Sequence, residues 1–185
     1  MSGPRRISTP LDERTLRSLA AGTRVLLSGE VFAARDQAHI RMLDELRSGA
    51  GLPFDPRGAA IYYVGPTPGA GGRPVGSAGP TTSGRMDSML EPLLAAGVRA
   101  TIGKGPRSGP AKAAMRRFGA IYLAATGGAG ALLGSRIERA EILAYEDLGP
   151  EALRRLVVRE LPLVVVVDTE GRDLCEELPP RFRRA

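Results

Sequence analysis

The sequence of 185 residues contains one cysteine, one histidine and no tryptophan. A lone thiol, Cys175, has no partner for an internal disulfide and supplies too few thiolates for a metal or iron–sulfur centre, so we expect no metal site on this chain. No apolar run approaches the roughly 20 residues of a membrane-spanning helix, and the opening MSGPRRISTP has no apolar segment typical of a secretory signal. These absences predict a cytoplasmic protein without membrane contact.

Aromatic residues are also scarce, at 4% of the chain. The formal charge of +6 raises the question of nucleic acid, yet the arginines are scattered among acidic residues rather than gathered in one stripe. Only the tail at 179–185, with Arg181, Arg183 and Arg184, forms a basic cluster. Because platforms for base stacking are lacking, nucleic-acid binding is not expected, and an acidic small molecule or partner subunit fits the charge better.

Expected strands and helices alternate along the chain, which predicts one α/β domain over residues 1–185 with a largely buried central sheet. Periodicity and cap signals place helices at 10–22 after a Thr9 cap, at 36–48, 83–96 and 111–118, from about 128, and at 150–156. Strands are expected at 24–30, 59–64, 99–102, 120–124, 140–145 and 163–168. The last of these, LVVVVD, is continuously apolar and predicts a strand covered on both faces. Residues 1–8 are expected to form an N-terminal arm.

Glycine is abundant in three places that could suggest loops for ligands. Residues 65–79 are too long and irregular for a simple connection, so we expect a functional loop that orders against another part of the molecule. In YLAATGGAGALLG the glycines only loosely match a dinucleotide fingerprint, and close strand-to-helix packing explains them better. IGKG, residues 102–105, lacks the Ser or Thr of a phosphate-binding loop, which excludes ATP binding there.

The stretch GSAGPTTSGRMD, residues 76–87, places glycines, hydroxyls and an arginine at the entrance of the helix expected at 83–96. Apolar residues at helical spacing mark the buried face of that helix: Met86, Met89, Leu90, Leu93 and Leu94. The first N–H groups of a helix lack intrahelical partners and carry the positive end of its dipole. A receptor for a carboxylate or phosphate would then be surrounded by Thr81, Thr82, Ser83 and Arg85. The alternative is an ordinary N-cap beside a solvated arginine.

Further polar side chains stand near expected strand ends. Arg35 lies at a strand-to-helix junction, and Lys104 follows a strand, where ligands of α/β folds commonly bind. His39 lies about one helical turn after Arg35, on the same side. Each position also has a plainer interpretation: a solvated lysine, a structural or exposed histidine, and for Asp36 an N-cap or first-turn acid that complements the helix dipole.

Six motifs occur together, in an order and at a spacing that indicate a family. They are RDQAH (35–39), YYVGP (62–66), GSAGPTTSGRMD (76–87), IGKG (102–105), GGAGALL (127–133) and AYEDLG (144–149). Together they closely resemble the beta subunit, or C-terminal domain, of class I fumarate hydratase and of L-tartrate dehydratase, the iron–sulfur hydro-lyases. The resemblance covers residues 28–174, and its GPTTSGRMD motif is highly specific.

The resemblance implies that this chain is one part of an enzyme. In the family, an alpha subunit holds a 4Fe-4S cluster through three cysteines, and the beta portion is a swivelling β/β/α domain that closes over the cluster. The motifs carry over Arg35, Thr81, Arg85 and Lys104 as the side chains that contact the dicarboxylate, with Thr81 as the proposed catalytic base. His39, Thr82 and Ser83 are secondary candidates. The implied partners are a cluster-bearing alpha subunit, in a hetero-oligomer, and a small dicarboxylate.

The resulting hypothesis is the beta subunit of a heteromeric hydro-lyase that interconverts fumarate and L-malate. Cations placed in advance would stabilise two carboxylates and the further negative charge of the carbanion. Threonine is a poor base at its ordinary pKa, so Thr81 needs a site that favours its alkoxide or relays its proton. Two alternatives stay open: L-tartrate dehydratase, which gives oxaloacetate, and a non-catalytic dicarboxylate-binding module. Because closure and assembly exclude water, the pocket of the isolated chain should be exposed.

Overall fold

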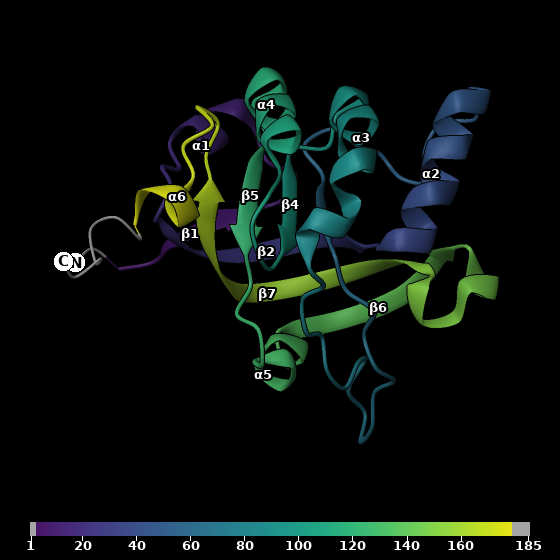
Figure 1. The fold of residues 1–185 in the computed structure, drawn as a ribbon. Helices are drawn as coiled ribbons and strands as arrows, with labels where there is room; N and C mark the ends of the chain where they lie inside the picture. Colours follow the sequence, from purple (N-terminus) through teal and green to yellow (C-terminus); the bar gives the residue numbers. More distant parts are fainter. Residues whose placement is uncertain (1–2, 179–185) are drawn as a thin grey trace.

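The computed structural model describes residues 3–178 (Figure 1). Its strands are β1 (Arg5–Ser8), β2 (Arg24–Ala33), β3 (Ala60–Tyr62), β4 (Ala100–Gly103), β5 (Ile121–Ala124), β6 (Ile137–Ala144) and β7 (Leu153–Val167). Its α-helices are α1 (Glu13–Arg17), α2 (Asp36–Ser48), α3 (Leu90–Ala96), α4 (Gly109–Phe118), α5 (Gly130–Gly134) and α6 (Leu174–Glu177), and its 3-10 helices are η1 (Ser83–Met89) and η2 (Glu146–Glu151). No helix in this range is both long and apolar enough to cross a membrane. The basic tail expected at 179–185 lies outside the described residues.

The seven described strands form one mixed sheet that closes on itself. Strands β1 to β5 are neighbours in chain order, and each pairs parallel with the next. β7 pairs antiparallel with β5, with β6 and with β2, and the β2–β7 ladder closes the sheet. β1 and β6 remain outside the closed part. Because β2 to β5 are parallel, their carboxyl ends lie together at one edge of the sheet and their amino ends at the other.

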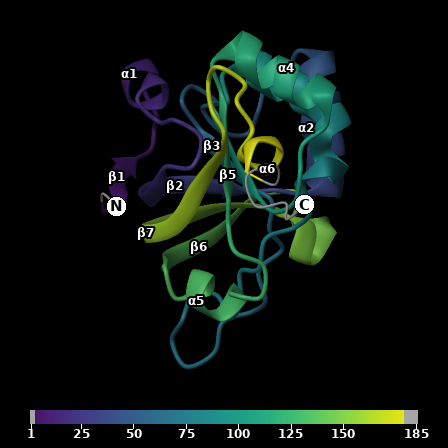
Figure 2. The ribbon, with the colours of Figure 1, turned by 60° about the vertical axis from the view of Figure 1, so that its left-hand side comes forward.

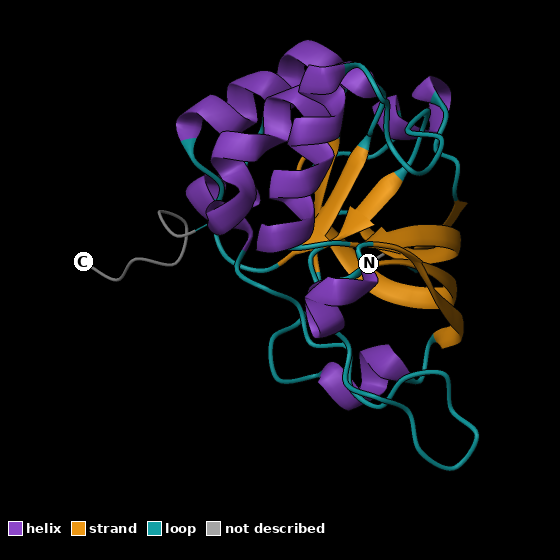
Figure 3. Cartoon of the chain, turned by 90° about the vertical axis from the view of Figure 1, so that its right-hand side faces the viewer, coloured by secondary structure: helices purple, strands orange, loops and turns teal. Residues whose placement is uncertain are grey.

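Successive residues along the strands belong to two different apolar cores, as the alternation of side chains in a strand requires. In β3, Tyr62 belongs to the core that the closed sheet surrounds, whereas Ile61 packs in a second core with residues of α2, α3 and α4. These three helices lie side by side over one face of the sheet (Figures 1 and 3), and α1 lies on the other side (Figure 2). The prediction of an α/β domain with a buried sheet is therefore confirmed.

Helix α2 has the bounds that the sequence predicts, from Asp36 to Ser48. Gly49 ends it in the left-handed conformation, with a φ of 79°, and its N–H donates to the Leu46 carbonyl at 3.2 Å. Glycine adopts this conformation without steric cost, which is why a helix so often stops there. The start of α2 determines where Arg35 lies, because Arg35 is the N-cap residue of this helix.

The N-terminal segment differs from the expected arm and helix. Residues 5–8 form β1 and pair with β2, because Ile7 belongs to the core inside the sheet and is only 7% exposed. Helix α1 is also shorter than predicted, and its N-cap is Asp12 rather than Thr9. The Asp12 carboxylate accepts a hydrogen bond from Thr15 N at 2.6 Å, which ends the extended chain and starts the helix.

The helix predicted at 150–156 is wrong. η2 ends at Glu151 and β7 begins at Leu153, because this stretch pairs with β2 on one side and with β6 on the other. Such tertiary pairing overrides local helix propensity. The strand expected at 163–168 is the end of β7, and coverage from both sides is confirmed because Leu163 and Val166 belong to different cores.

The long loop at 65–79 extends below β6 in Figure 1. Its end returns to the domain and packs on α5, where Ala78 N donates to the Gly130 carbonyl at 2.9 Å. A Cβ on Gly134 would lie 2.4 Å from the Gly76 carbonyl oxygen, so no larger residue fits there without moving the loop. The glycines of GGAGALLG therefore serve close packing, as predicted, but they admit this loop rather than a strand.

Candidate functional site

The four principal residues expected in the site lie at the edge of the sheet where the parallel strands end. Arg35 follows β2 by two residues, and Lys104 directly follows β4. Thr81 and Arg85 come from the connection between β3 and β4, which returns to this same edge. The carboxyl-end edge of an α/β sheet is where such folds usually bind ligands.

The segment Thr81–Ser83 is inserted between the ends of β3 and β4. Thr81 N donates to the Tyr63 carbonyl at 2.7 Å, and Lys104 N donates to the Thr81 carbonyl at 3.1 Å. Ser83 N then donates to the Lys104 carbonyl at 2.8 Å. The insertion requires glycine at position 103, since a Cβ on Gly103 would lie 2.1 Å from Ser83 Oγ. The main chain of Thr81 and Lys104 is thus fixed by the sheet itself.

This insertion changes the predicted helix entrance. The first turns are the 3-10 helix η1, and the α-helix starts only at α3. Ser83 N–H, expected to be free for an anion, is bound to the Lys104 carbonyl. The Ser83 side chain is buried, and its hydroxyl donates to Tyr122 Oη at 3.0 Å. Thr82 occupies the N-cap position without a side-chain cap bond and is exposed. Ser83 is therefore held by the protein, whereas Thr82 is accessible.

The Asp36 carboxylate connects the two predicted arginines. Arg85 Nε donates to Asp36 Oδ1 at 2.9 Å, and Arg85 Nη2 lies 2.8 Å from Oδ2. Arg35 Nε lies 3.6 Å from the same Oδ2. On its other side, Arg35 Nη2 donates to Glu151 Oε1 at 2.9 Å, and Glu151 Oε2 accepts from Gln37 N at 3.0 Å. Asp36 is therefore the first-turn acid of α2 rather than its N-cap, and it is a counter-ion that both guanidinium groups share.

The polar ends of these side chains are only partly enclosed. The Arg85 side chain is 50% exposed and that of Arg35 is 28% exposed. Thr81 is half-buried and Lys104 is exposed. Arg85 Nη1 makes no hydrogen bond to any residue between 3 and 178. Each guanidinium is thus oriented by carboxylates of its own chain while part of it remains open to a further acceptor. The site of the isolated chain is exposed, as expected.

A buried polar layer lies beneath the inserted segment. Arg107 has a fully buried side chain, and its Nε contacts Asp87 Oδ1 at 2.6 Å while Nη1 donates to Thr101 Oγ1 at 3.0 Å. Its guanidinium lies 5.6 Å from the ring centre of Tyr63 and 5.1 Å from that of Tyr122. Burial opposes the charge of Arg107, but Tyr63 and Asp87 outweigh it and raise its pKa. Tyr63 and Tyr122 also contact the inserted segment, so this layer supports the site from below.

His39 is completely buried between α2 and the sheet. Its Nδ1 lies 3.1 Å from the Arg35 carbonyl oxygen, which can only accept, so Nδ1 carries the proton. The ring packs edge-on against Tyr63 at a centroid distance of 5.3 Å. Burial lowers the pKa of His39 to about 4, against smaller opposing effects of the Arg35 carbonyl and Asp36. The neutral imidazole therefore binds the main-chain carbonyl of Arg35 from inside the protein, and its own ring is not exposed.

Sequence reasoning missed the residues that orient the site. Glu151 lies just beyond the AYEDLG motif, in the segment where the sequence predicted a helix at 150–156. Arg107 and Asp87 carry no periodic signal, and their pairing depends on how η1 packs beside α4. The signal available was the presence of charged residues within the motifs, as for Asp87, or just outside them, as for Arg107 and Glu151. The charge alone does not reveal the partner.

No group of three His, Cys, Asp or Glu side chains in residues 3–178 is placed to hold a metal ion. The lone thiol, Cys175, is exposed on α6. The acidic residues at the site, Asp36 and Glu151, are engaged by arginines instead. The residues present therefore do not fit an iron–sulfur cluster bound by this chain.

Comparison with known proteins gives a consistent picture. The family model for the Fumarase C-terminus matches residues 5–178. Over 84% of its length the chain is 39% identical to fumarate hydratase 1, mitochondrial, of Leishmania major, and it covers 29% of that protein. It is 34% identical to a putative L(+)-tartrate dehydratase subunit beta of Methanocaldococcus jannaschii, with 91% of this chain and 89% of the relative covered. For the L(+)-tartrate dehydratase subunit beta of Escherichia coli the identity is 31%, with 92% and 86% covered.

Proposed function

Because this chain belongs to the Fumarase C-terminus family, we propose that it is the beta subunit of a heteromeric hydro-lyase interconverting fumarate and L-malate. It would supply the dicarboxylate-binding half of the active site. The chain spans less than a third of the length of the fumarate hydratases it matches, but most of the length of the tartrate dehydratase beta subunits. The names of the tartrate dehydratase relatives, which are beta subunits, support a subunit that works with a partner chain.

The proposal rests on one observation: the guanidinium groups of Arg35 and Arg85 both form ion pairs with the carboxylate of Asp36. Thr81 and Lys104 lie beside them at the same edge of the sheet. Two guanidinium groups oriented in this way offer planar donors at adjacent positions. Fumarate and malate carry two carboxylates a short distance apart. Adjacent oriented cations at a strand-end edge suit such a ligand better than a single anion.

The charge balance of the site favours an anionic ligand and an anionic transition state. Three cationic side chains, Arg35, Arg85 and Lys104, stand against the carboxylates of Asp36 and Glu151. A dicarboxylate adds two negative charges, and the carbanion formed during hydration spreads further charge onto a carboxylate. Donors already in place stabilise that charge without a reorganisation cost, which is the main source of rate enhancement in many enzymes.

Thr81 is proposed to position a proton at its hydroxyl. Its main chain is bound on both sides, by Tyr63 and by Lys104, so the direction of the side chain is set by the sheet. Within residues 3–178 its hydroxyl has no hydrogen-bond partner that could accept the proton. For Thr81 to act as a base, its own hydroxyl proton must pass to another group. That group would belong to the substrate or to a partner subunit. The secondary candidate Thr82, exposed next to it, could contribute only a hydroxyl contact to the ligand.

We assign the 4Fe-4S cluster to a partner alpha subunit, because the residues described here offer no ligand set for it. When bound, such a cluster supplies a Lewis-acidic iron. The part of this chain is then to bind and orient the dicarboxylate and to exclude water. The exposure of Arg85 and Lys104 supports this division, since a second surface is needed to enclose the ligand. We also propose that the domain is of the swivelling β/β/α type and closes over that surface.

L-tartrate is the second candidate substrate. Two relatives, at 34% and 31% identity, are named as beta subunits of L(+)-tartrate dehydratase, the first of them as a putative one. The two substrates differ by hydroxyl groups, and a site that hydrogen-bonds a hydroxyl strongly rejects an analogue without it. Turnover of both substrates by one preparation is therefore expected to be very unequal.

The test is anaerobic co-expression of this chain with a cluster-bearing alpha chain, followed by assays with fumarate, L-malate and L-tartrate. We expect turnover of one substrate by the complex and none by this chain alone. Binding of fumarate or tartrate without turnover by the assembled, cluster-loaded complex would support the non-catalytic binding module instead. Absence of any complex between the two chains would refute the subunit proposal.

A further inference from the structure

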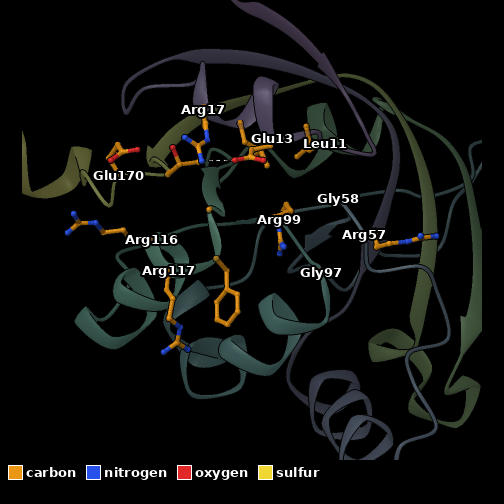
Figure 4. A pocket seen from close by; sticks show the side chains of 14 residues that line it. Leu11, Glu13, Arg17, Arg57, Gly58, Gly97, Arg99, Arg116, Arg117 and Glu170 are labelled. Atoms are coloured by element: carbon orange, nitrogen blue, oxygen red, sulfur yellow. Dashed lines mark ion pairs between the residues drawn. The ribbon is translucent and has the colours of Figure 1, made fainter.

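A second arginine-rich region lies at the opposite edge of the sheet. It is a hollow of about 540 Å³, shown in Figure 4, between α1, the end of α4 and the loops that precede the parallel strands. Gly58, Gly97 and Gly119 line it, and they come just before β3, β4 and β5. The hollow is therefore at the amino ends of the strands, whereas the proposed dicarboxylate site is at their carboxyl ends. Nothing in the proposed reaction uses it.

Cations outnumber anions on the lining of this hollow. It is lined by five arginines, namely Arg17, Arg57, Arg99, Arg116 and Arg117, and by two glutamates, Glu13 and Glu170. Three of the arginines form ion pairs at the rim, with Glu13, Asp55 and Glu91 as partners. Arg99 and Arg116 form no ion pair with any described residue. Arg99 and Arg116 are therefore the two lining arginines without a direct carboxylate partner among the described residues, and the nearby carboxylates are Glu170, on the same lining, and the buried Asp168.

Arg99 occupies the middle of the hollow in Figure 4. It is half-buried, and its Nη1 donates to the carbonyls of Leu94 and Val98, both at 2.9 Å. These carbonyls belong to the end of α3 and its continuation, so the guanidinium is oriented without losing its charge to a carboxylate. Arg116 stands on α4, with its aliphatic stem near the backbone of Gly171. Arg99 is thus oriented and can still donate to an incoming anion, whereas the Arg116 side chain extends away from Arg99 in Figure 4 and makes no hydrogen bond to a described residue.

We propose that this hollow is a binding site for a small phosphate-bearing anion, with Arg99 and Arg116 as its principal ligands. Guanidinium groups pair with phosphate oxygens through two parallel hydrogen bonds, and several arginines favour a multiply charged group over a single carboxylate. The volume falls within the range of about 300 to 1,000 Å³ usual for small-molecule sites. The apolar side chains of Leu16 and Phe118 also line it and offer contact to an organic part of the ligand.

The test is isothermal titration calorimetry of the whole chain with sodium pyrophosphate, and separately with ADP, at low ionic strength. We expect saturable one-to-one binding of pyrophosphate with a Kd below about 1 mM. Arg99→Gln and Arg116→Gln should each weaken it by about tenfold, because each removes a charged donor to the phosphate. Arg116 is exposed and makes no ion pair with residues 3–178, so its variant tests the site without disturbing the described fold.

Two control variants each lose one positive charge, as the test variants do, but at positions outside the hollow. Arg139→Gln removes an exposed arginine on β6, away from the hollow, and Arg85→Gln removes one from the dicarboxylate site. Both should bind pyrophosphate as the unaltered chain does. Tighter binding of ADP than of pyrophosphate would identify an organic phosphate as the ligand, and equal or weaker binding an inorganic one.

Three results would overturn the proposal. One is the absence of saturation up to about 10 mM pyrophosphate, which corresponds to a negligible affinity. Another is equal weakening by all four substitutions, which would reflect net charge alone. The third is unchanged pyrophosphate binding in Arg99→Gln together with weaker association with an alpha subunit, which would make the hollow a protein interface. The first two results do not depend on the proposed function, and the third requires only that the chain associates with an alpha subunit.

Discussion

The two edges of the sheet both present arginines, but they hold them in different ways. At the carboxyl-end edge, Arg35 and Arg85 are oriented by the carboxylates of Asp36 and Glu151. At the amino-end edge, the central Arg99 is oriented by main-chain carbonyls. A carboxylate fixes a guanidinium through charge-assisted bonds but cancels its charge, whereas a carbonyl fixes it less firmly and leaves the charge intact.

This difference suits the two edges to different ligands. Arginines held firmly by carboxylates favour a ligand whose carboxylates must be placed accurately for chemistry. An arginine that is held by carbonyls, with no carboxylate partner, favours an anion that is only bound. The edges also differ in what lies beneath them. The carboxyl-end edge covers the buried ion pair of Arg107 and Asp87, whereas at the amino-end edge the buried carboxylate of Asp168 accepts hydrogen bonds from main-chain N–H groups.

The largest expected effect concerns that buried layer. Arg107→Met removes a fully buried cation and leaves the Asp87 carboxylate, 9% exposed, without its counter-ion. Breaking a buried ion pair in this way should lower the free energy of unfolding by about 3 to 5 kcal/mol. The matched change at the other edge, Arg99→Met, breaks only bonds to carbonyls near solvent and should cost about 1 kcal/mol. Urea unfolding of both variants measures the contrast, and equal losses would show that the two edges are built alike.

The architecture around this layer could be predicted from local patterns only in part. The helix from Asp36 to Ser48 was predictable because its first-turn acid, its periodicity and its terminal glycine all agree. The strand from Leu153 was not, because only pairing with β2 and β6 makes that stretch extended. The same reason hid the closure of the sheet, which depends on the long ladder between β2 and β7.

The candidate site shows the same division. The motifs and their positions after expected strands predicted Arg35 and Lys104 at strand ends, and both residues lie at the carboxyl-end edge of the sheet. The pairings of Asp36 with Arg85, and of Glu151 with Arg35, join segments that lie far apart in the chain. Charge in a sequence indicates that a counter-ion is needed, but only the fold selects which one.

His39 gives the next largest effect, through pH. Its pKa is lowered from 6.5 to about 4, so the unfolded chain binds a proton that the folded chain does not. The stability due to the neutral imidazole is complete above pH 6.5 and is lost as the pH falls towards 4, by up to about 3 kcal/mol. In His39→Leu this part of the pH dependence should disappear, while the Arg35 carbonyl keeps its main-chain bond from the N–H of residue 39. The free energy of unfolding of both proteins is measured at pH 7 and pH 4.5. An equal loss in both would show that His39 does not carry this part of the pH dependence.

A catalytic effect is expected next, at the open side of the carboxyl-end edge. Arg85→Ala removes the more exposed of the two guanidinium groups, while Arg35 keeps its bond to Glu151. In the complex with an alpha subunit, hydration of fumarate should fall by at least about a hundredfold, the usual cost of a lost charge-stabilising donor. Association of the subunits should be unchanged, and Arg139→Ala should leave turnover near normal. Near-normal turnover in Arg85→Ala would remove this residue from the proposed site.

Glu151→Gln gives the smallest of these effects and tests whether orientation or net charge governs the carboxyl-end edge. Glu151 accepts from Arg35 Nη2 and from Gln37 N with different oxygens, and an amide has only one oxygen for these two donors. Arg35 should lose its fixed direction, and kcat/KM should fall by about tenfold, mainly through a higher KM, because Arg35 binds a carboxylate in the ground state as well. The substitution also makes the edge more positive, so if charge alone mattered the KM would fall instead. Steady-state kinetics of the assembled complex separate the two outcomes, and a lower KM would mean that the two edges attract anions in the same way.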